Sequence, residues 1–278
     1  MSRHVRPATG SPALTKPLTR RGRRGRTFLK RYLYAQLALR HAAMIALGKE
    51  EPLVGFTVEA DPPSVYLVYR IRQDALETLP DLLRLPDRLR PTPIRCLADD
   101  EPEYLMALNL YRVSGLAKGI RAEWSIFVGD EHDVPRYFVI DARSSETSMD
   151  PVDIITRATT VEHERRGETI VSRVGDGAEA FRSTIDLAAE PDAPLVVPSA
   201  EWAAANDFIY WGNGICDRTY YDAGMHDSRM RRVGADALDQ SDGTPWAAIV
   251  EPDPVHVLVF EHAIELVISP WENLGRLG

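Results

Sequence analysis

The charged residues whose spacing best suits chemistry are Arg121 and Glu123, in the run Arg121-Ala122-Glu123-Trp124. The surrounding segment, 119–128, is rich in β-branched and aromatic residues and is predicted to be a strand, in which alternate side chains share one face. The charged pair therefore shares its face with Ser125. The opposite face is apolar and consists of Ile120, Ala122, Trp124 and Ile126.

This charged face has two interpretations. On a β-sandwich it would be the outer surface, and the pair would be solvated. In a ligand-binding barrel the polar face can line the interior, where Glu123 would be the catalytic acid or base and Arg121 would hold the anionic end of a ligand. Arg70 and Arg143 are further candidates for that substrate-binding role.

A second group of polar and aromatic residues lies between Tyr210 and Arg232. This composition is typical of a small-molecule pocket, and also of a polar loop across the mouth of a barrel. The candidate substrate-binding residues in this stretch are Trp211, Asn213, Asp217, Tyr221 and His226. No spacing matches a known metal site, so no metal is expected, and nothing in the sequence places Cys216 against His226 as nucleophile and base.

The charge of the chain is unevenly distributed. Of the 33 Lys and Arg residues, 12 precede Glu50, whereas all 41 Asp and Glu residues lie at or after it. Residues 50–278 therefore carry a formal charge of −20, although the whole chain carries −8. A body this acidic is not expected to bind nucleic acid through its own surface. The two cysteines, Cys96 and Cys216, have no metal or redox spacing and are expected to be reduced thiols in the cytoplasm.

The basic amino-terminal segment divides into two parts. Residues 1–26 have no hydrophobic period and are predicted to be a disordered arm, whereas residues 27–48 have the apolar periodicity of an amphipathic helix. The helix is expected to pack on the main domain, with a membrane-surface or homo-oligomer contact as the alternative. The basic residues within 1–31 could contact an anionic membrane or the protein's own acidic surface. Neither a cleavable signal nor a membrane-spanning stretch is predicted.

The remaining sequence reads as short strands separated by Pro and Gly turns. It predicts a mainly β (α+β) fold, an antiparallel barrel or sandwich with an appended amino-terminal helix, in one domain over 27–278. A helical turn broken by Pro80 is expected over 74–83. The expected strands are 53–58, 65–71, 103–113, 119–128, 136–141, 154–157, 169–174, 181–187, 207–211, 218–221, 247–250, 255–260 and 264–268.

Several short motifs resemble the amino-terminal half of acetoacetate decarboxylase and its superfamily. They are Val68-Tyr69-Arg70, Asp74-Ala75-Leu76, Leu79-Pro80, Ser114-Gly115 and Glu123. The resemblance fades after Asp141. It implies an acetoacetate decarboxylase-like β-fold, in which the family's inward glutamate falls at Glu123.

The lysine pair that performs the Schiff-base chemistry of that family is missing. By the resemblance it would fall within 144–164, and this window contains no lysine. Of the four lysines in the chain, Lys16, Lys30 and Lys49 lie in the basic segment and Lys118 lies in a hairpin turn. Arginine cannot form an imine because its guanidinium stays protonated. The Schiff-base mechanism is therefore excluded.

The sequence predicts a lysine-free relative that binds or transforms a small organic acid or carbonyl compound inside the fold, through a lyase-like reaction without a Schiff base. The alternative is a non-catalytic barrel that carries a lipophilic ligand, associated with a membrane through the basic segment. No cofactor is expected. The expected location is cytoplasmic, with the inner membrane face as a peripheral site. A small cavity with converging polar groups would favour the first function, and a long apolar tunnel the second.

Overall fold

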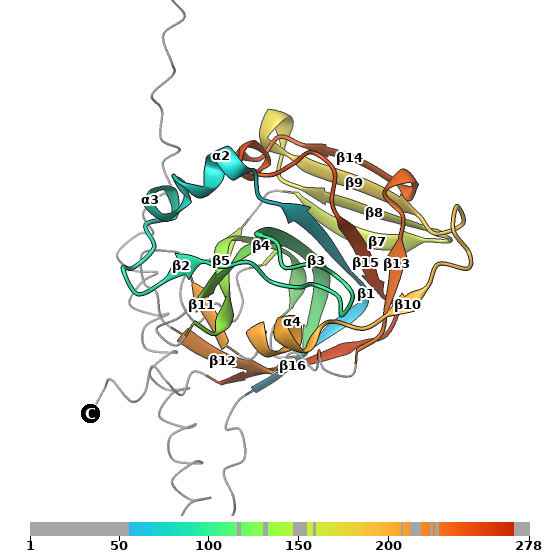
Figure 1. The fold of residues 1–278 in the computed structure, drawn as a ribbon. Coiled ribbons are helices and arrows are strands. Elements are labelled where there is room, and N and C mark those ends of the chain that lie inside the picture. The colour runs from blue at the N-terminus through green and yellow to red at the C-terminus, as the bar shows by residue number, and fades with distance from the viewer. Residues whose placement is uncertain are drawn as a thin grey trace, which may run out of the picture.

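The computed structural model describes residues 56–115, 118–129, 133–146, 155–157, 160–206, 208–211, 218–222, 225 and 228–269 (Figure 1). The predicted arm over 1–26 and the predicted helix over 27–48 lie outside these ranges, and so do Asn213, Asp217 and His226. None of the helices within the described ranges combines the length and the apolar character that crossing a bilayer requires.

Strands dominate the described chain. They are β1 (Phe56–Arg70), β2 (Arg90–Pro91), β3 (Leu105–Gly115), β4 (Gly119–Gly129), β5 (Pro135–Ser144), β6 (Ile155–Arg157), β7 (Val161–Arg166), β8 (Thr169–Val174), β9 (Phe181–Asp186), β10 (Leu195–Val196), β11 (Phe208–Trp211), β12 (Arg218–Asp222), β13 (Met230–Val233), β14 (Leu238–Asp242), β15 (His256–Phe260) and β16 (Ile264–Ser269). The helices are short: α2 (Gln73–Leu76), α3 (Leu79–Leu83), α4 (Ala200–Ala205) and the 3-10 turns Gly177–Glu179, Ala235–Ala237 and Pro245–Ala248.

The larger sheet contains a closed cycle of strand pairs, here called the strand ring. Its order is β1-β3-β4-β5-β11-β12-β16, with β16 pairing back to β1. Every neighbouring pair in the ring is antiparallel except β5 with β11. The mainly antiparallel β-fold expected from the sequence is confirmed, and Figure 1 shows the ring strands surrounding a common interior.

β1 pairs with two different strands along one edge, before and after an irregularity in its middle. Its first half, Phe56–Ala60, pairs with β16, and its second half, Ser64–Val68, pairs with β15. Between them the register against β3 shifts, at the segment Asp61-Pro62-Pro63-Ser64. Proline has no N–H to donate to a ladder, so this is where pairing is interrupted. β15, β13 and β10 then extend the sheet beyond the ring.

Two hydrophobic cores share the ring strands. One fills the ring interior and includes Tyr66, Phe127 and Tyr137. The other lies on the outer face of the same strands and includes Trp124, together with Ile170 and Phe181 of the four-stranded sheet β14-β9-β8-β7. Figure 1 shows this second sheet beside the ring. β4 is therefore buried on both faces from residue 121 to 129.

One local prediction was wrong. The strand expected over 247–250 is instead occupied by the 3-10 turn Pro245–Ala248, with Val250 in an isolated bridge to Ile71. The interruption expected at Pro80 is confirmed, since α2 ends at Leu76 and α3 begins at Leu79, with Pro80 in its first turn, where its missing N–H costs nothing. β7 and β14 were not predicted from the sequence, because most of their residues are polar and the alternation of apolar and polar residues is too weak to indicate a strand.

His163 on β7 joins the second sheet to β1. Its Nε2 lies 2.8 Å from the carbonyl oxygen of Pro63, which can only accept, so Nε2 donates and Nδ1 accepts from the hydroxyl of Ser172 at 2.8 Å. Burial lowers the pKa of His163 from 6.5 to about 4, with a smaller lowering from Arg112 and an opposing effect of the Pro63 carbonyl. The folded protein therefore favours the neutral ring.

Above pH 6.5, His163 is neutral in both the folded and the unfolded protein, and the free energy of unfolding should not depend on it. Below pH 6.5 the free energy of unfolding should fall as the pH drops toward 4, because the unfolded chain takes up the proton first. The loss is at most about 3 kcal/mol. Denaturant unfolding at several pH values measures it. His163→Gln should flatten this part of the profile, whereas the exposed control His262→Gln should not. If the free energy of unfolding of His163→Gln depended on pH as strongly as that of the wild type, this assignment would be contradicted.

Candidate active site

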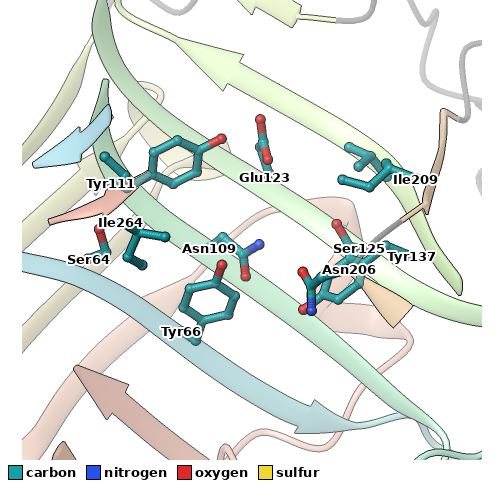
Figure 2. A pocket seen from close by; sticks show the side chains of 12 residues that line it. Ser64, Tyr66, Asn109, Tyr111, Glu123, Ser125, Tyr137, Asn206, Ile209 and Ile264 are labelled. Atoms are coloured by element: carbon teal, nitrogen blue, oxygen red, sulfur yellow. The ribbon is translucent and has the colours of Figure 1, made fainter. Parts of the chain in front are cut away.

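A row of polar side chains crosses three neighbouring strands of the ring. Tyr66 of β1 pairs with Asn109 of β3, and Asn109 pairs with Glu123 of β4. Directly paired residues lie on the same face of a sheet, with their Cβ atoms roughly 5 Å apart. Because Tyr66 belongs to the interior core, the whole row faces the inside of the ring. Figure 2 shows these three side chains side by side.

The row lines a cavity with an empty volume of about 440 Å³ when its open mouth is counted, so the enclosed part is smaller. Eight of the twelve lining residues are polar and four are apolar. The lining consists of Ala60, Ser64, Tyr66, Asn109, Tyr111, Glu123, Ser125, Tyr137, Val139, Asn206, Ile209 and Ile264. The enclosed part has room for about one or two water molecules, so a larger ligand must also occupy the open mouth, and a long hydrocarbon chain does not fit inside.

Three buried polar atoms in the cavity wall lack a hydrogen-bond partner in the described structure. They are the hydroxyl oxygens of Ser64 and Ser125 and the side-chain carbonyl oxygen of Asn109. A buried polar atom without a partner costs about 1–3 kcal/mol, and such atoms in folded proteins normally contact water or a ligand. All three line one small cavity, which indicates a binding site.

The other polar groups are held by the protein. Tyr137 accepts a hydrogen bond of 2.9 Å from the indole N–H of Trp202, and the amide N–H of Asn206 donates to the Trp202 carbonyl at 2.9 Å. Both contacts depend on α4, which is capped by the Ser199 hydroxyl and packs beside β5 and β11. Trp202 thus fixes the Tyr137 ring while leaving its hydroxyl proton available to donate.

Two phenols of the cavity wall, Tyr66 and Tyr137, are candidates for hydrogen-bond donors. Burial raises the pKa of Tyr66, and the negative charge of Glu123 raises it further. Burial is also the main cause of the raised pKa of Tyr137, with added effects of Tyr66 and Glu123, opposed by the Trp202 hydrogen bond. Both hydroxyls therefore stay protonated at neutral pH. Figure 2 also shows the Tyr111 hydroxyl and the Glu123 carboxylate turned toward each other.

The structure decides between the two interpretations of the charged strand face. Glu123 is only 7% exposed and lines the cavity, so the face is interior and not the outer surface. Arg121 is also buried and lies on the same face of β4, opposite Tyr111 and Ser144. Both charged groups interact with other parts of the protein. Arg121 is close in sequence to the cavity but is not among the residues that line it.

The structure brings neither Arg70 nor Arg143 to this cavity. Arg70 lies at the surface, where its guanidinium binds Glu103 at 2.7 Å and Glu251 at 3.0 Å. The guanidinium carbon of Arg143 lies 5.1 Å from the centroid of the Trp124 indole, on the outer side of the strand ring.

A bulge in β5 accounts for the direction of Arg143. Trp124 pairs with Asp141 and Ser125 with Val139, so Ile140 is an extra residue. Simple alternation from the inward Val139 would point residue 143 inward, but the extra residue puts Ala142 inside instead. The Nε of Arg143 then lies 3.2 Å from a carboxylate oxygen of Asp141, which also accepts from the indole N–H of Trp246 at 3.0 Å.

The second candidate group is only partly described. Trp211 is in β11 and Tyr221 in β12, and both strands belong to the ring, but their side chains are outside the described structure. Asn213, Asp217 and His226 are outside the described residues altogether. Their assignment as substrate-binding residues stays a prediction.

Most of the cavity wall was missed by sequence reasoning. Ser125 follows from the alternation that starts at Glu123. Asn109 could have been found from the hairpin register, because pairing Val113 with Gly119 places Asn109 opposite Glu123. No local signal marks Ser64, Tyr66, Tyr137 or Asn206, because they reach the cavity only through the closure of the ring and the position of α4.

No family model and no curated protein matches the chain. Among solved structures, one similar chain is an acetoacetate decarboxylase-like enzyme from Sphingomonas wittichii RW1, with 9% identity, a TM-score of 0.46, and coverage of 77% of this chain and 89% of that one. Another is the enduracididine biosynthesis enzyme MppR, complexed with the condensation product of pyruvate and imidazole 4-carboxaldehyde. It has 10% identity, a TM-score of 0.40, and coverage of 76% of this chain and 86% of that one.

We expect Glu123→Gln to change the free energy of unfolding by less than about 1 kcal/mol, because the amide keeps the shape and most hydrogen-bonding capacity. Glu123→Leu should destabilise by about 1–3 kcal/mol, since it removes the carboxylate from buried polar neighbours. Denaturant unfolding measures both changes. The exposed Glu59 of β1 supplies matched controls, Glu59→Gln and Glu59→Leu, each expected to be nearly silent. If Glu123→Leu were equally silent, Glu123 would not be a buried, partnered group.

Proposed function

We propose that this protein binds a small carbonyl compound or organic acid in the cavity around Glu123 and transfers a proton to or from it. The observation that carries the proposal is the group of three unpartnered buried oxygens, on Ser64, Asn109 and Ser125, beside a buried carboxylate. Together they offer donors to a carbonyl oxygen and acceptors to a hydroxyl group.

The proposed reaction is removal of a proton from the carbon next to the carbonyl. Glu123 would take this proton, and the protonated hydroxyl of Tyr66 or Tyr137 would donate to the carbonyl oxygen as negative charge develops on it. The low-dielectric interior of the ring strengthens such a hydrogen bond. Arg121 lies two residues from Glu123 on the same face of β4 but does not line the cavity, so the proposal assigns it no direct contact with the ligand.

This chemistry needs no imine. No lysine is among the cavity-lining residues that the structure describes, and Lys118 is exposed. The small size of the cavity supports a small ligand over the alternative, a carrier of a lipophilic molecule, which would require a long apolar tunnel.

Deuterium exchange into carbonyl compounds tests the proposal. Pyruvate, levulinate and hydroxyacetone, incubated with the full-length protein in D₂O, are followed by loss of the proton NMR signal next to the carbonyl. We expect protein-dependent exchange into at least one of them, reduced about 10²-fold or more in Glu123→Gln. Glu59→Gln is the matched control and should exchange like the wild type. Exchange that is absent for all three compounds, or undiminished in Glu123→Gln, would contradict the proposal.

Two further experiments distinguish the proposed reaction from an imine mechanism and from a carrier function. Borohydride treatment during the reaction should leave no adduct on any lysine, and a lysine adduct would replace the proposed mechanism with an imine. If the protein instead binds a long-chain fatty acid and exchanges none of the three compounds, the carrier function is favoured.

A further inference from the structure

A second cluster of reactive side chains lies outside the cavity, where the segment between β2 and β3 meets β15. It consists of Cys96, Asp100 and His256, whose potential ligand atoms all lie within 4.8 Å of one another. Cys96 is 1% exposed and His256 is 7% exposed, whereas Asp100 is partly open to solvent. Thiolate, imidazole and carboxylate are the three side-chain groups that bind zinc in proteins.

The backbone holds these side chains in position. Ile94 and Glu103 exchange two backbone hydrogen bonds of 2.9 and 3.1 Å, which close the segment that contains Cys96 and Asp100. Within it, the Asp100 carboxylate accepts from the Leu97 N–H at 2.7 Å. His256 comes from β15, where it pairs with Val68. Such preorganisation lowers the cost of binding an ion.

The hydrogen bonds present do not satisfy this cluster. The Nε2 of His256 lies 2.8 Å from the Asp100 carboxylate, but its Nδ1 is buried and has no hydrogen-bond partner in the described structure. The deeply buried thiol of Cys96 is also a poor candidate for a nucleophile, because reactive cysteines are at least partly accessible. The three side chains can instead bind a metal ion together, with one ring nitrogen of His256 as a ligand atom.

We infer that Cys96, Asp100 and His256 form a binding site for one divalent zinc-like ion. A deprotonated Cys96 and the Asp100 carboxylate would supply two negative charges to balance the ion. Among the other charged groups, Arg232 acts on both Cys96 and His256, whereas Glu103 acts on His256 alone and opposes only part of this positive charge. Water would complete a four-coordinate site, and the partly open Asp100 provides the entry path.

The ligand atoms, which lie within 4.8 Å of one another, must rearrange to admit the ion. Nitrogen and oxygen ligands on tetrahedral zinc are roughly 3.3 Å apart, given bond lengths near 2.0–2.2 Å. The Nε2–Oδ2 separation of 2.8 Å must therefore open slightly. A bound ion would tie the segment containing Cys96 and Asp100 to β15, and through Val68 to β1, which also carries Tyr66 of the cavity.

Cobalt titration tests the site, because Co²⁺ replaces Zn²⁺ and gives a near-ultraviolet charge-transfer band only when a thiolate binds it. Full-length protein is stripped with a chelator and titrated. We expect a band that saturates at one equivalent of Co²⁺ and disappears when Zn²⁺ is added. Zn²⁺ should also raise the thermal unfolding midpoint.

Variants assign the ligands. Cys96→Ala should abolish the band, whereas Cys216→Ala, the matched control at the other cysteine, should keep it. Asp100→Asn and His256→Gln should each weaken metal affinity at least tenfold, and they decide the question if Cys96→Ala does not fold. The inference is overturned by a wild-type protein without the band, by a band that survives in Cys96→Ala, or by one that is lost in Cys216→Ala.

Discussion

The pairing of β3 with β4 is the interaction on which the rest of the structure depends, because this hairpin separates two cores. Its outer face packs Trp124 against the four-stranded sheet, and its inner face holds Asn109 and Glu123 side by side. A shift of one residue in this register would exchange the two faces, placing the carboxylate in an apolar core and the indole in the cavity. The packing of Trp124 therefore fixes the direction of Glu123.

The same arrangement explains how a polar cavity persists inside a β-fold. Most of the interior core consists of closely packed apolar side chains. Where the cavity lies, however, the side-chain oxygens of Ser64, Asn109 and Ser125 have no hydrogen-bond partner in the described structure. Each such atom lowers stability, and the outer core, with its continuous apolar contacts, offsets this cost. Unsatisfied groups concentrated in one cavity are the pattern expected of a binding site.

Much of the fold could be predicted from alternation and turn residues, including the strands β3, β4, β8 and β9. The inward direction of Glu123 could not be derived from alternation alone, since alternation identifies a shared face without saying which core covers it. Arg143 shows a second limit, because one extra residue in β5 reverses its direction. Tyr66, Tyr137 and Asn206 come together only through long-range strand pairing and the position of α4. His163 was hidden in a polar strand, and Cys96 and His256 are 160 residues apart.

Whether the cavity around Glu123 is a site for a small polar ligand can be seen in a high-resolution crystal structure of the purified full-length protein. We expect ordered density, from water or a co-purified small molecule, within hydrogen-bonding distance of the Ser125 hydroxyl and the Asn109 side-chain oxygen. A closed cavity, with those two atoms bonded to other protein groups and no density between them and Glu123, would contradict a binding site there.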